Sequence, residues 1–379
     1  MVVPAGSGPG HPVDPETPVA GLPLLRRIAL AAARAGFGPV LVHSGIGARG
    51  LEGTAATPLG EAGMPPPAGR RRVVVMPANI VPQPQWLRSL LDRPVEGETL
   101  YADEVGVSMV ETTNPQRLLA AAARCRSAAA LATALRGLYG PAPRALEGDG
   151  RFPLGAARDV PKAERWLLRS LIKDSEGFMS RHFERRLSLA LTRRLVATRI
   201  TPNAMTVVSL AVGLAAAPFF LSPAPGWQLA GALIFLVHSI LDGCDGELAR
   251  LKFLESSGGA ILDFWGDNLV HVAVFGCMAV GWSLAAGSAW PLWLGAVAIA
   301  SALVAAGAVA PHILAPAPTG AGASAGARLA DALSHRDFIY LVILLSAVGR
   351  AAWFVALAAV GTPIFVAVRL WADRSRREG

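Results

Sequence analysis

The chain has 379 residues, of which 53% are hydrophobic and only 16% are charged, and its mean hydropathy is +0.43. Soluble domains carry about 25% charged residues, so an ordinary water-facing surface is excluded and a membrane protein is indicated. The formal net charge of the chain is +8. Lys and Arg accumulate at the cytoplasmic ends of membrane helices, and we favour this explanation of the positive charge over nucleic-acid binding. The three cysteines, Cys125, Cys244 and Cys277, lie far apart and form no C-x-x-C motif. The sequence therefore predicts neither a disulfide framework nor a thiolate zinc site.

Residues 1–158 are rich in Pro, Gly, Ala and Arg and hold no uncharged stretch long enough to cross a bilayer. Helices are expected over residues 22–35 and 85–91, and buried strands over residues 39–43 and 72–76. Segments 45–71 and 147–161 are expected to be loops. This alternation predicts a cytoplasmic α/β domain of the Rossmann-like class. The first thirty residues lack a basic start followed by an apolar core, so no signal peptide is expected.

Residues 159–200 are strongly basic and amphipathic. Arginines such as Arg165, Arg169 and Arg185 alternate with apolar residues such as Trp166 and Phe183. We interpret this stretch as a juxtamembrane helix, or a pair of helices, in the lipid headgroup zone. A solvated surface helix is the alternative.

Residues 201–379 are predicted to form a transmembrane domain. Neither stretch 203–241 nor stretch 268–327 contains an Asp, Glu, Lys or Arg. Because a spanning helix needs about 20 apolar residues, the domain is predicted to hold about six spans, two of them between residues 338 and 368. An even number of spans places both termini on the cytoplasmic side of the inner membrane, and Arg350 on the outer side.

Four aspartates interrupt these apolar helices: Asp242, Asp245, Asp263 and Asp267. Each pair is spaced three or four residues apart and therefore lies on one face of its helix, so two facing helices would gather four carboxylates. Such charges need compensation in a site of low dielectric constant. Oxygen ligands without Cys or clustered His favour a hard cation such as Mg²⁺, Mn²⁺ or Ca²⁺, and paired hard cations typically stabilise phosphoryl transfer.

The residues around the aspartates fit a phosphate substrate. Gly246 lies one turn after Asp242, and Gly259 lies one turn before Asp263, so each leaves space beside a carboxylate. Arg250 can hold two phosphate oxygens with its guanidinium group.

The spacing Asp242-x2-Asp245-Gly246-x2-Ala249-Arg250-x8-Gly259-x3-Asp263-x3-Asp267 resembles the signature of the CDP-alcohol phosphotransferases, membrane enzymes of phospholipid synthesis. The resemblance implies about six spans and two divalent cations, Mg²⁺ or Mn²⁺, held by Asp242, Asp245, Asp263 and Asp267. It also implies that Asp267 is the general base and that Gly246, Ala249, Arg250 and Gly259 form the floor of the CDP site. The implied reaction transfers a phosphoryl-linked group from a CDP-alcohol, CDP-diacylglycerol or a CDP-polyol, to an acceptor alcohol and releases CMP.

The N-terminal pattern over residues 21–79 is similar to sugar-nucleotidyltransferase domains. The Gly-rich segment 5–10 lacks the basic residue of those enzymes, and Met76-Pro-Ala-Asn79 offers no acidic metal ligand, so an inactive domain is expected. The fusion resembles bifunctional proteins in which an inositol-phosphate cytidylyltransferase supplies a di-inositol-phosphate phosphate synthase. A structural or partner-binding domain is the favoured interpretation.

Other interpretations remain. One alternative is an Asp-rich prenyltransferase, which would need a second Asp-rich motif that the chain lacks. The other is a non-catalytic membrane scaffold, in which the aspartates would form a structural polar network. We expect His238 and His271 to be packing residues, with a role for His271 in orienting Asp267 or contacting the acceptor as the alternative. We assign no role to Glu247 or Cys244. A phosphorylated polyol acceptor would need further cations, for which His335, Arg336 and, less favourably, Arg350 are candidates. Membrane lipids are expected partners, nucleic acid is not, and a homodimer is left open.

Overall fold

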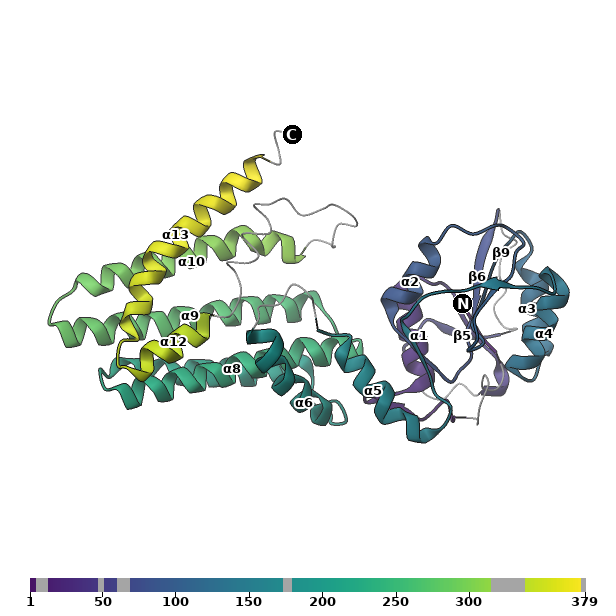
Figure 1. The fold of residues 1–379 in the computed structure, drawn as a ribbon, viewed down its shortest axis with the longest axis horizontal. Helices are drawn as coiled ribbons and strands as arrows, with labels where there is room; N and C mark the ends of the chain where they lie inside the picture. Colours follow the sequence, from purple (N-terminus) through teal and green to yellow (C-terminus); the bar gives the residue numbers. More distant parts are fainter. Residues whose placement is uncertain (5–12, 47–50, 60–68, 173–178, 315–337, 376–379) are drawn as a thin grey trace. The chain divides into compact units, whose positions relative to one another are not determined.

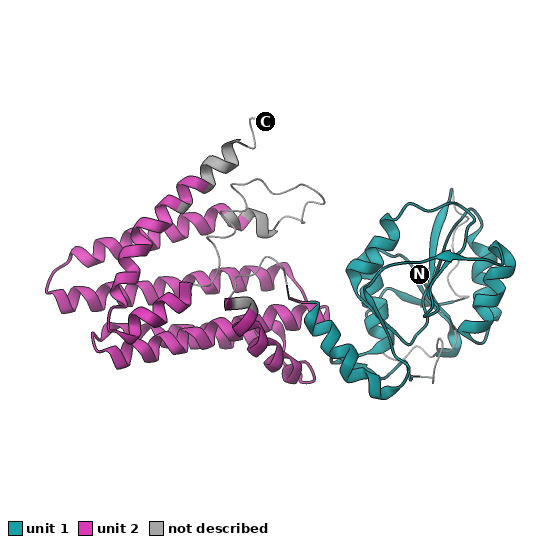
Figure 2. Cartoon of the chain, viewed as in Figure 1, with its two compact units in different colours: residues 1–170 teal, residues 171–379 magenta. Residues whose placement is uncertain are grey.

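The computed structural model describes residues 1–4, 13–46, 51–59, 69–172, 179–314 and 338–375. The chain divides into two compact units, Met1–Ser170 and Leu171–Gly379 (Figure 2). The expected juxtamembrane stretch 159–200 is therefore shared between them.

Unit 1 is built on a mixed sheet of seven short strands in the order β10-β8-β9-β6-β1-β4-β5. Strand β1 pairs in parallel with β4 and β6, whereas β9 runs antiparallel to β6 and β8. The sheet strands are β1 (Val2–Val3), β4 (Val40–Val42), β5 (Ala56–Pro58), β6 (Arg71–Val75), β8 (Tyr101–Ala102), β9 (Ser108–Thr112) and β10 (Arg144–Ala145). Two small antiparallel pairs join β2 (Pro18–Val19) to β3 (Leu22–Pro23), and β7 (Ile80–Pro82) to β11 (Arg151–Pro153).

Helices cover both faces of this sheet, with α1 and α2 on one side and α3 and α4 on the other (Figure 1). Leu118 of α3 and Leu131 of α4 pack against sheet residues such as Val75 and Val110. The helices are α1 (Leu24–Ala35), α2 (Pro84–Asp92), α3 (Pro115–Arg124), α4 (Ala128–Tyr139) and α5 (Val160–Arg169), with short 3-10 turns η1 (Ser44–Ile46) and η2 (Ala157–Asp159). An N-terminal α/β unit is therefore confirmed.

The expected helices and strands of unit 1 form close to their predicted bounds. Helix α1 begins two residues later than expected, because Leu22–Pro23 pairs as β3 before the helix starts. Segment 45–71, expected to be a loop, contains the edge strand β5. Arg27 of α1 is buried and donates to the carbonyl oxygens of Val19 and Ala20 at 3.1 and 3.0 Å. Burial lowers the pKa of this guanidinium group to about 10.

Unit 2 is helical. After a π-helical turn η3 (Ser180–Glu184), its helices are α6 (Arg185–Leu195), α7 (Pro202–Ala216) with the 3-10 extension η4 (Ala217–Leu221), α8 (Pro225–Lys252), α9 (Ser257–Ala286), α10 (Trp290–Leu314), α12 (Phe338–Ala347) and α13 (Ala352–Ser375). Within the described residues, four segments are long and apolar enough to cross a membrane: Pro202–Leu221, Pro225–Lys252, Ser257–Ala286 and Trp290–Ala308. Shorter apolar helices lie at Phe338–Ala347 and Ala352–Val368. The chain is an integral membrane protein.

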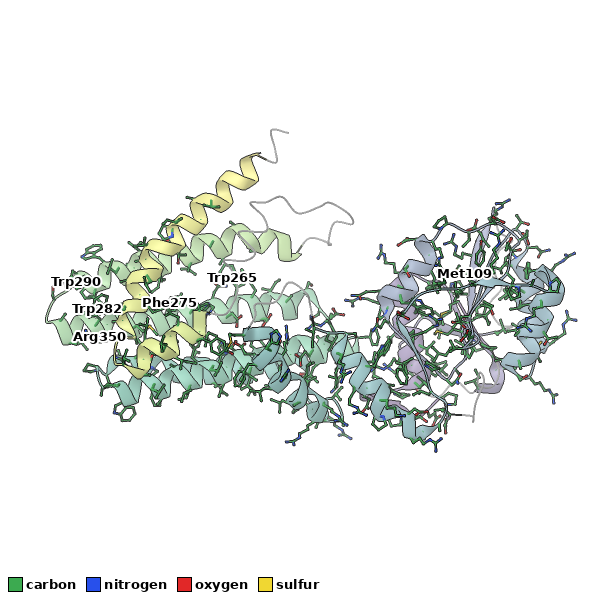
Figure 3. The ribbon with its side chains drawn as sticks, viewed as in Figure 1. Met109, Trp265, Phe275, Trp282, Trp290 and Arg350 are labelled. Carbon is green, nitrogen blue, oxygen red and sulfur yellow. The ribbon has the colours of Figure 1, made fainter. Side chains whose placement is uncertain are left out.

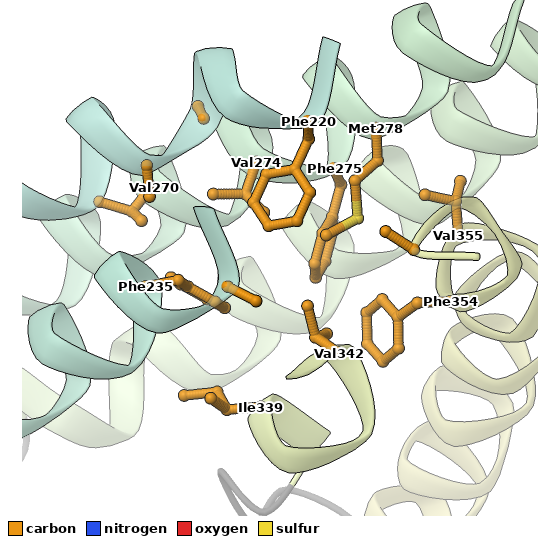
Figure 4. Packing of buried hydrophobic residues seen from close by; sticks show 14 of the residues in the cluster. Phe220, Phe235, Val270, Val274, Phe275, Met278, Ile339, Val342, Phe354 and Val355 are labelled. Carbon is orange, nitrogen blue, oxygen red and sulfur yellow. The ribbon is translucent and has the colours of Figure 1, made fainter. Parts of the chain in front are cut away.

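The core of unit 2 lies between α7, α8, α9, α12 and α13, where buried apolar side chains interdigitate (Figure 4). Phe275 of α9 and Phe354 of α13 have ring centroids 5.4 Å apart. Gly281 of α9 packs against the last residues of η4. A Cβ added at Gly281 would collide with the carbonyl oxygen of Phe220. Small residues of this kind let membrane helices approach closely.

Helix α6 docks on α8 through a buried polar cluster rather than through apolar contacts alone. Glu247 of α8 has no exposed surface and accepts hydrogen bonds from Ser188 Oγ at 2.7 Å and Thr192 Oγ1 at 2.6 Å. Arg185 Nη1 lies 2.9 Å from Glu247 Oε1. Lys252 Nζ, at the end of α8, donates to the carbonyl oxygens of Thr198 and Ile200. The basic helix is therefore fixed to the helix that carries Asp242 and Asp245.

Candidate metal and nucleotide site

The turn between α8 and α9 places the two aspartate pairs at matching depths. Asp245 lies seven residues before the end of α8, and Asp263 lies six residues after the start of α9; Asp242 and Asp267 each lie ten residues from these ends. At a rise of about 1.5 Å per residue, each aspartate of one helix is level with one of the other. Two local features fix the turn, because Phe253 ends α8 in the left-handed conformation and the Ser256 hydroxyl accepts from the Gly259 N–H at 3.0 Å.

Three of the four aspartates come together. Asp242, Asp245 and Asp263 each offer an oxygen atom, and these atoms all lie within 4.8 Å of one another. Asp242 and Asp245 are buried, and Asp263 is half-buried. Like charges at this separation repel strongly where water is scarce, so the group fits a bound cation and is costly without one. The oxygen-only ligand set suits Mg²⁺ or Mn²⁺.

Asp267 lies one helical turn beyond Asp263 and is half-buried. Its Oδ1 is 3.6 Å from Nε2 of His238, a residue of α8 that we expected to serve packing alone. His271, one turn further along α9, stacks on Phe275 with ring centroids 5.8 Å apart and belongs to an aromatic cluster.

A cavity of about 210 Å³ opens beside the aspartates. Its walls include all four residues expected at the nucleotide site, together with Asp245 and Asp263: Gly246, Ala249, Arg250 and Gly259. Arg250 lies beside Gly246, since its Nη2 would be in ordinary contact, at 3.8 Å, with a Cβ added at that glycine. The cavity can therefore present an arginine to phosphate oxygens next to a carboxylate cluster.

Sequence reasoning missed the two polar wall residues from α7, Asn203 and Thr206. The Thr206 hydroxyl donates to Asp245 Oδ2, and Asn203 Oδ1 would lie 2.9 Å from a Cβ added at Gly259. Helix α7 begins here because the Thr201 side chain accepts from the Ala204 N–H and Pro202 occupies the first turn. An asparagine and a threonine within the first five residues of a mostly apolar span were an available signal for such a role.

Of the remaining cation candidates, only Arg350 lies within the described residues, and it is not at this cavity. His335 and Arg336 lie outside the described residues. Arg350 lies over the Trp353 ring, 5.2 Å from its centroid, between α12 and α13. The preceding residue, Gly349, adjoins Pro225 at the start of α8, and Asp242 lies seventeen residues further along that helix, about 25 Å away.

Comparison with known proteins identifies the membrane part. Residues 199–347 match the family model of CDP-alcohol phosphatidyltransferase. A bifunctional IPC transferase and DIPP synthase of Thermococcus kodakarensis is 36% identical over 135 residues, which are 35% of this chain and 30% of that protein. The inner membrane protein YnjF of Escherichia coli is 38% identical over 99 residues, 25% of this chain and 46% of that protein.

A CDP-diacylglycerol–serine O-phosphatidyltransferase of Mycobacterium bovis is 37% identical over 99 residues, 24% of this chain and 34% of that protein. The chain thus matches less than half of the length of each of these relatives. The aspartate motif and its two helices lie inside the matched region. The membrane part of the chain is therefore similar, over residues 199–347, to the CDP-alcohol phosphatidyltransferases.

Proposed function

We propose that the membrane unit transfers a phosphoryl-linked group from a CDP-linked donor to an acceptor alcohol and releases CMP. The observation that carries this proposal is a cluster of three buried or half-buried carboxylates, two of which line one cavity together with Arg250 and Gly259. Asp242, Asp245 and Asp263 would hold divalent cations, with Asp267 as a further ligand. Bound Mg²⁺ or Mn²⁺ would neutralise charge on the phosphate oxygens of the donor.

The chain's own residues would then orient the reactants. Arg250 would bind the diphosphate, and Gly246, Ala249 and Gly259 would leave room for the nucleotide. Asp267 would take the proton from the acceptor hydroxyl while the oxygen of that hydroxyl bonds to the β-phosphorus of the donor. The bond from that phosphorus to the bridging oxygen breaks, and CMP leaves with the electron pair.

The test is CMP release by the purified full chain with CDP-diacylglycerol or CDP-inositol, a panel of alcohols and Mg²⁺, with products identified by mass spectrometry. Asp267→Asn is expected to lower turnover by at least about 100-fold, since proton transfer contributes about 10²–10⁴-fold. Asp92→Asn, the same change at an exposed position of unit 1, is the matched control. Unchanged CMP release from Asp267→Asn would refute the assignment of the base, whereas no CMP release from the original chain would favour the non-catalytic scaffold.

We further propose six membrane spans, formed by the four long helices together with α12 and α13, with both termini at the cytoplasmic side of the inner membrane. One end of the unit carries Trp282, Trp290 and Arg350 (Figure 3). Aromatic and basic residues are typical of the interface between a bilayer and water. The rings of Trp282 and Trp290 are 4.6 Å apart. This interface would be the outer one. Accessibility of a single cysteine placed at Ser288 to an impermeant thiol reagent, in a cysteine-free background, tests the orientation.

We propose that unit 1 is an inactive nucleotidyltransferase-like domain. The order β5-β4-β1-β6 corresponds to the first four strands, 3-2-1-4, of a Rossmann sheet, which supports the fold class. Asn79, where an acidic ligand would be expected, instead donates to the carbonyl oxygen of Leu154 at 3.1 Å. The Gly-rich segment 5–10 lies outside the described residues. Pyrophosphate release from CTP and a phosphorylated polyol would contradict inactivity.

A further inference from the structure

A second cavity, of about 270 Å³, lies at the end of unit 2 that carries Trp282 and Arg350 (Figure 3). Arg350 is the one charged residue among the described residues that line it, and Phe220, Met278 and Trp282 are among the apolar ones. Sites for small ligands enclose about 300–1,000 Å³, so this cavity suits a group as small as a lipid headgroup.

Buried Gln228 fixes the turn that carries Arg350. Its Oε1 accepts from the Ala351 N–H at 3.1 Å, and its Nε2 donates to the carbonyl oxygen of Ser222 at 3.2 Å. Gly349, with a φ of +71°, allows the chain to reverse after α12. The backbone at Arg350 is therefore held by a buried side chain, while the arginine side chain itself is exposed.

The described residues offer Arg350 no carboxylate at this end of the unit. Its guanidinium group forms no ion pair with any of them. On α8 the carboxylate nearest to the cavity is Asp242, fourteen residues after Gln228; on α9 it is Asp267, fourteen residues before Gly281. Each therefore lies about 21 Å from the cavity wall along its helix. The negative charge that would balance Arg350 has to come from outside these segments.

The aromatic contact of Arg350 leaves its N–H donors available. The guanidinium carbon lies 5.2 Å from the centroid of the Trp353 ring. A cation–π contact of this kind uses no N–H donor, and the planar fork of five donors matches two oxygens of a phosphate group. The cavity thus combines a bidentate phosphate donor with apolar walls.

We propose that this cavity binds the headgroup of a net-anionic phospholipid from the membrane leaflet that it faces. Arg350 pairs with the phosphodiester, and the apolar walls contact the glycerol backbone and the first methylene groups of the acyl chains. A free phosphate ion would gain nothing from apolar walls, and a zwitterionic headgroup would bring a second cation to Arg350. Such binding requires only that this end of the unit lies at a face of the bilayer, and it is independent of the proposed reaction.

The test is photo-crosslinking of the purified full chain, in detergent, to phosphatidylglycerol with a diazirine on its headgroup. Peptide mapping by mass spectrometry is expected to find crosslinks in segments 278–286 and 349–353. Excess unlabelled phosphatidylglycerol should abolish them, and excess phosphatidylcholine or inorganic phosphate should displace them far less. Displacement by inorganic phosphate would overturn the proposal in favour of a site for free anions. Equal displacement by phosphatidylcholine would overturn it in favour of unselective lipid contact.

Arg350→Gln is expected to weaken binding at these two segments at least about tenfold, because the charge-assisted hydrogen bonds to the phosphate are lost. Arg350→Lys, which keeps the charge without the fork, should give a smaller loss. Arg194→Gln removes the same charge from an exposed position of α6 and is the matched control. It should leave these crosslinks within about twofold of the original chain. An equal loss in Arg350→Gln and the control would overturn the proposal in favour of general attraction between the basic chain and anionic lipid.

Ala285→Leu provides a second measurement that leaves Arg350 in place. Ala285 is an exposed wall residue of α9, so a larger side chain would fill part of the cavity without entering the core. Binding should decrease severalfold, whereas Ala289→Leu, at an exposed position outside the walls, should not change it. Equal binding in these two variants would overturn the proposal. An unchanged melting temperature in lipid-free detergent shows that each variant is folded.

Discussion

Glu247→Ala tests whether the buried polar cluster holds α6 on α8. The substitution removes the acceptor for Ser188 and Thr192 and leaves Arg185 without its carboxylate partner at that position. Breaking a buried ion pair by deleting one partner costs about 3–5 kcal/mol. At about 2–4 °C of melting temperature per kcal/mol for a unit of this size, the expected decrease in Tm is about 6–20 °C.

The measurement is thermal unfolding of the purified full chain in one detergent at one protein concentration. Glu247→Gln keeps an oxygen acceptor for the two hydroxyl groups and should lose less than Glu247→Ala. Arg186→Ala, at an exposed position of α6, is the control and should stay within about 2 °C of the original chain. A Tm for Glu247→Ala equal to that of the control would refute the reasoning.

Gly281→Ala should lower thermal stability by about 1–3 kcal/mol, because its methyl group meets the Phe220 carbonyl oxygen, a backbone atom that cannot rotate away. Gly276→Ala, whose nearest neighbour would be 3.9 Å away, should be tolerated, and equal effects would contradict the packing argument. Gly259→Ala should raise the KM for the CDP-linked donor severalfold, since the new methyl group would lie 2.9 Å from Asn203 Oδ1 in the cavity wall; an unchanged KM would place the nucleotide elsewhere. Chelation by EDTA should abolish CMP release and Mg²⁺ should restore it, whereas activity that persists in EDTA would exclude a metal requirement.

The aspartate motif was predictable because its physical requirements are local. Three- and four-residue spacings fix which face of a helix each carboxylate occupies, and a short turn sets their depth. The partners of Glu247 were harder to predict, since Ser188 and Thr192 are polar residues in a basic stretch that suits the headgroup zone equally well. A glutamate without a role in the motif, inside a membrane helix, was nevertheless a sign that some partner existed.

Other features depend on contacts between distant segments. Strands β8 and β10 contain two residues each, too few for a periodic pattern, and they are defined only by pairing across the sheet. The approach of His238 to Asp267 could not be predicted from spacing, because the two residues lie on different helices.

The matched depths of the aspartates on α8 and α9 imply that the site depends on the number of residues between the two aspartate pairs as well as on the residue types. One extra residue between Ser256 and Asp263 would turn Asp263 by about 100° around the helix axis and move it by about 1.5 Å. Every residue type in the signature would still be present, yet the three carboxylates could no longer converge. Substitutions in the turn after α8 should therefore be tolerated more readily than insertions or deletions within the first turns of α9.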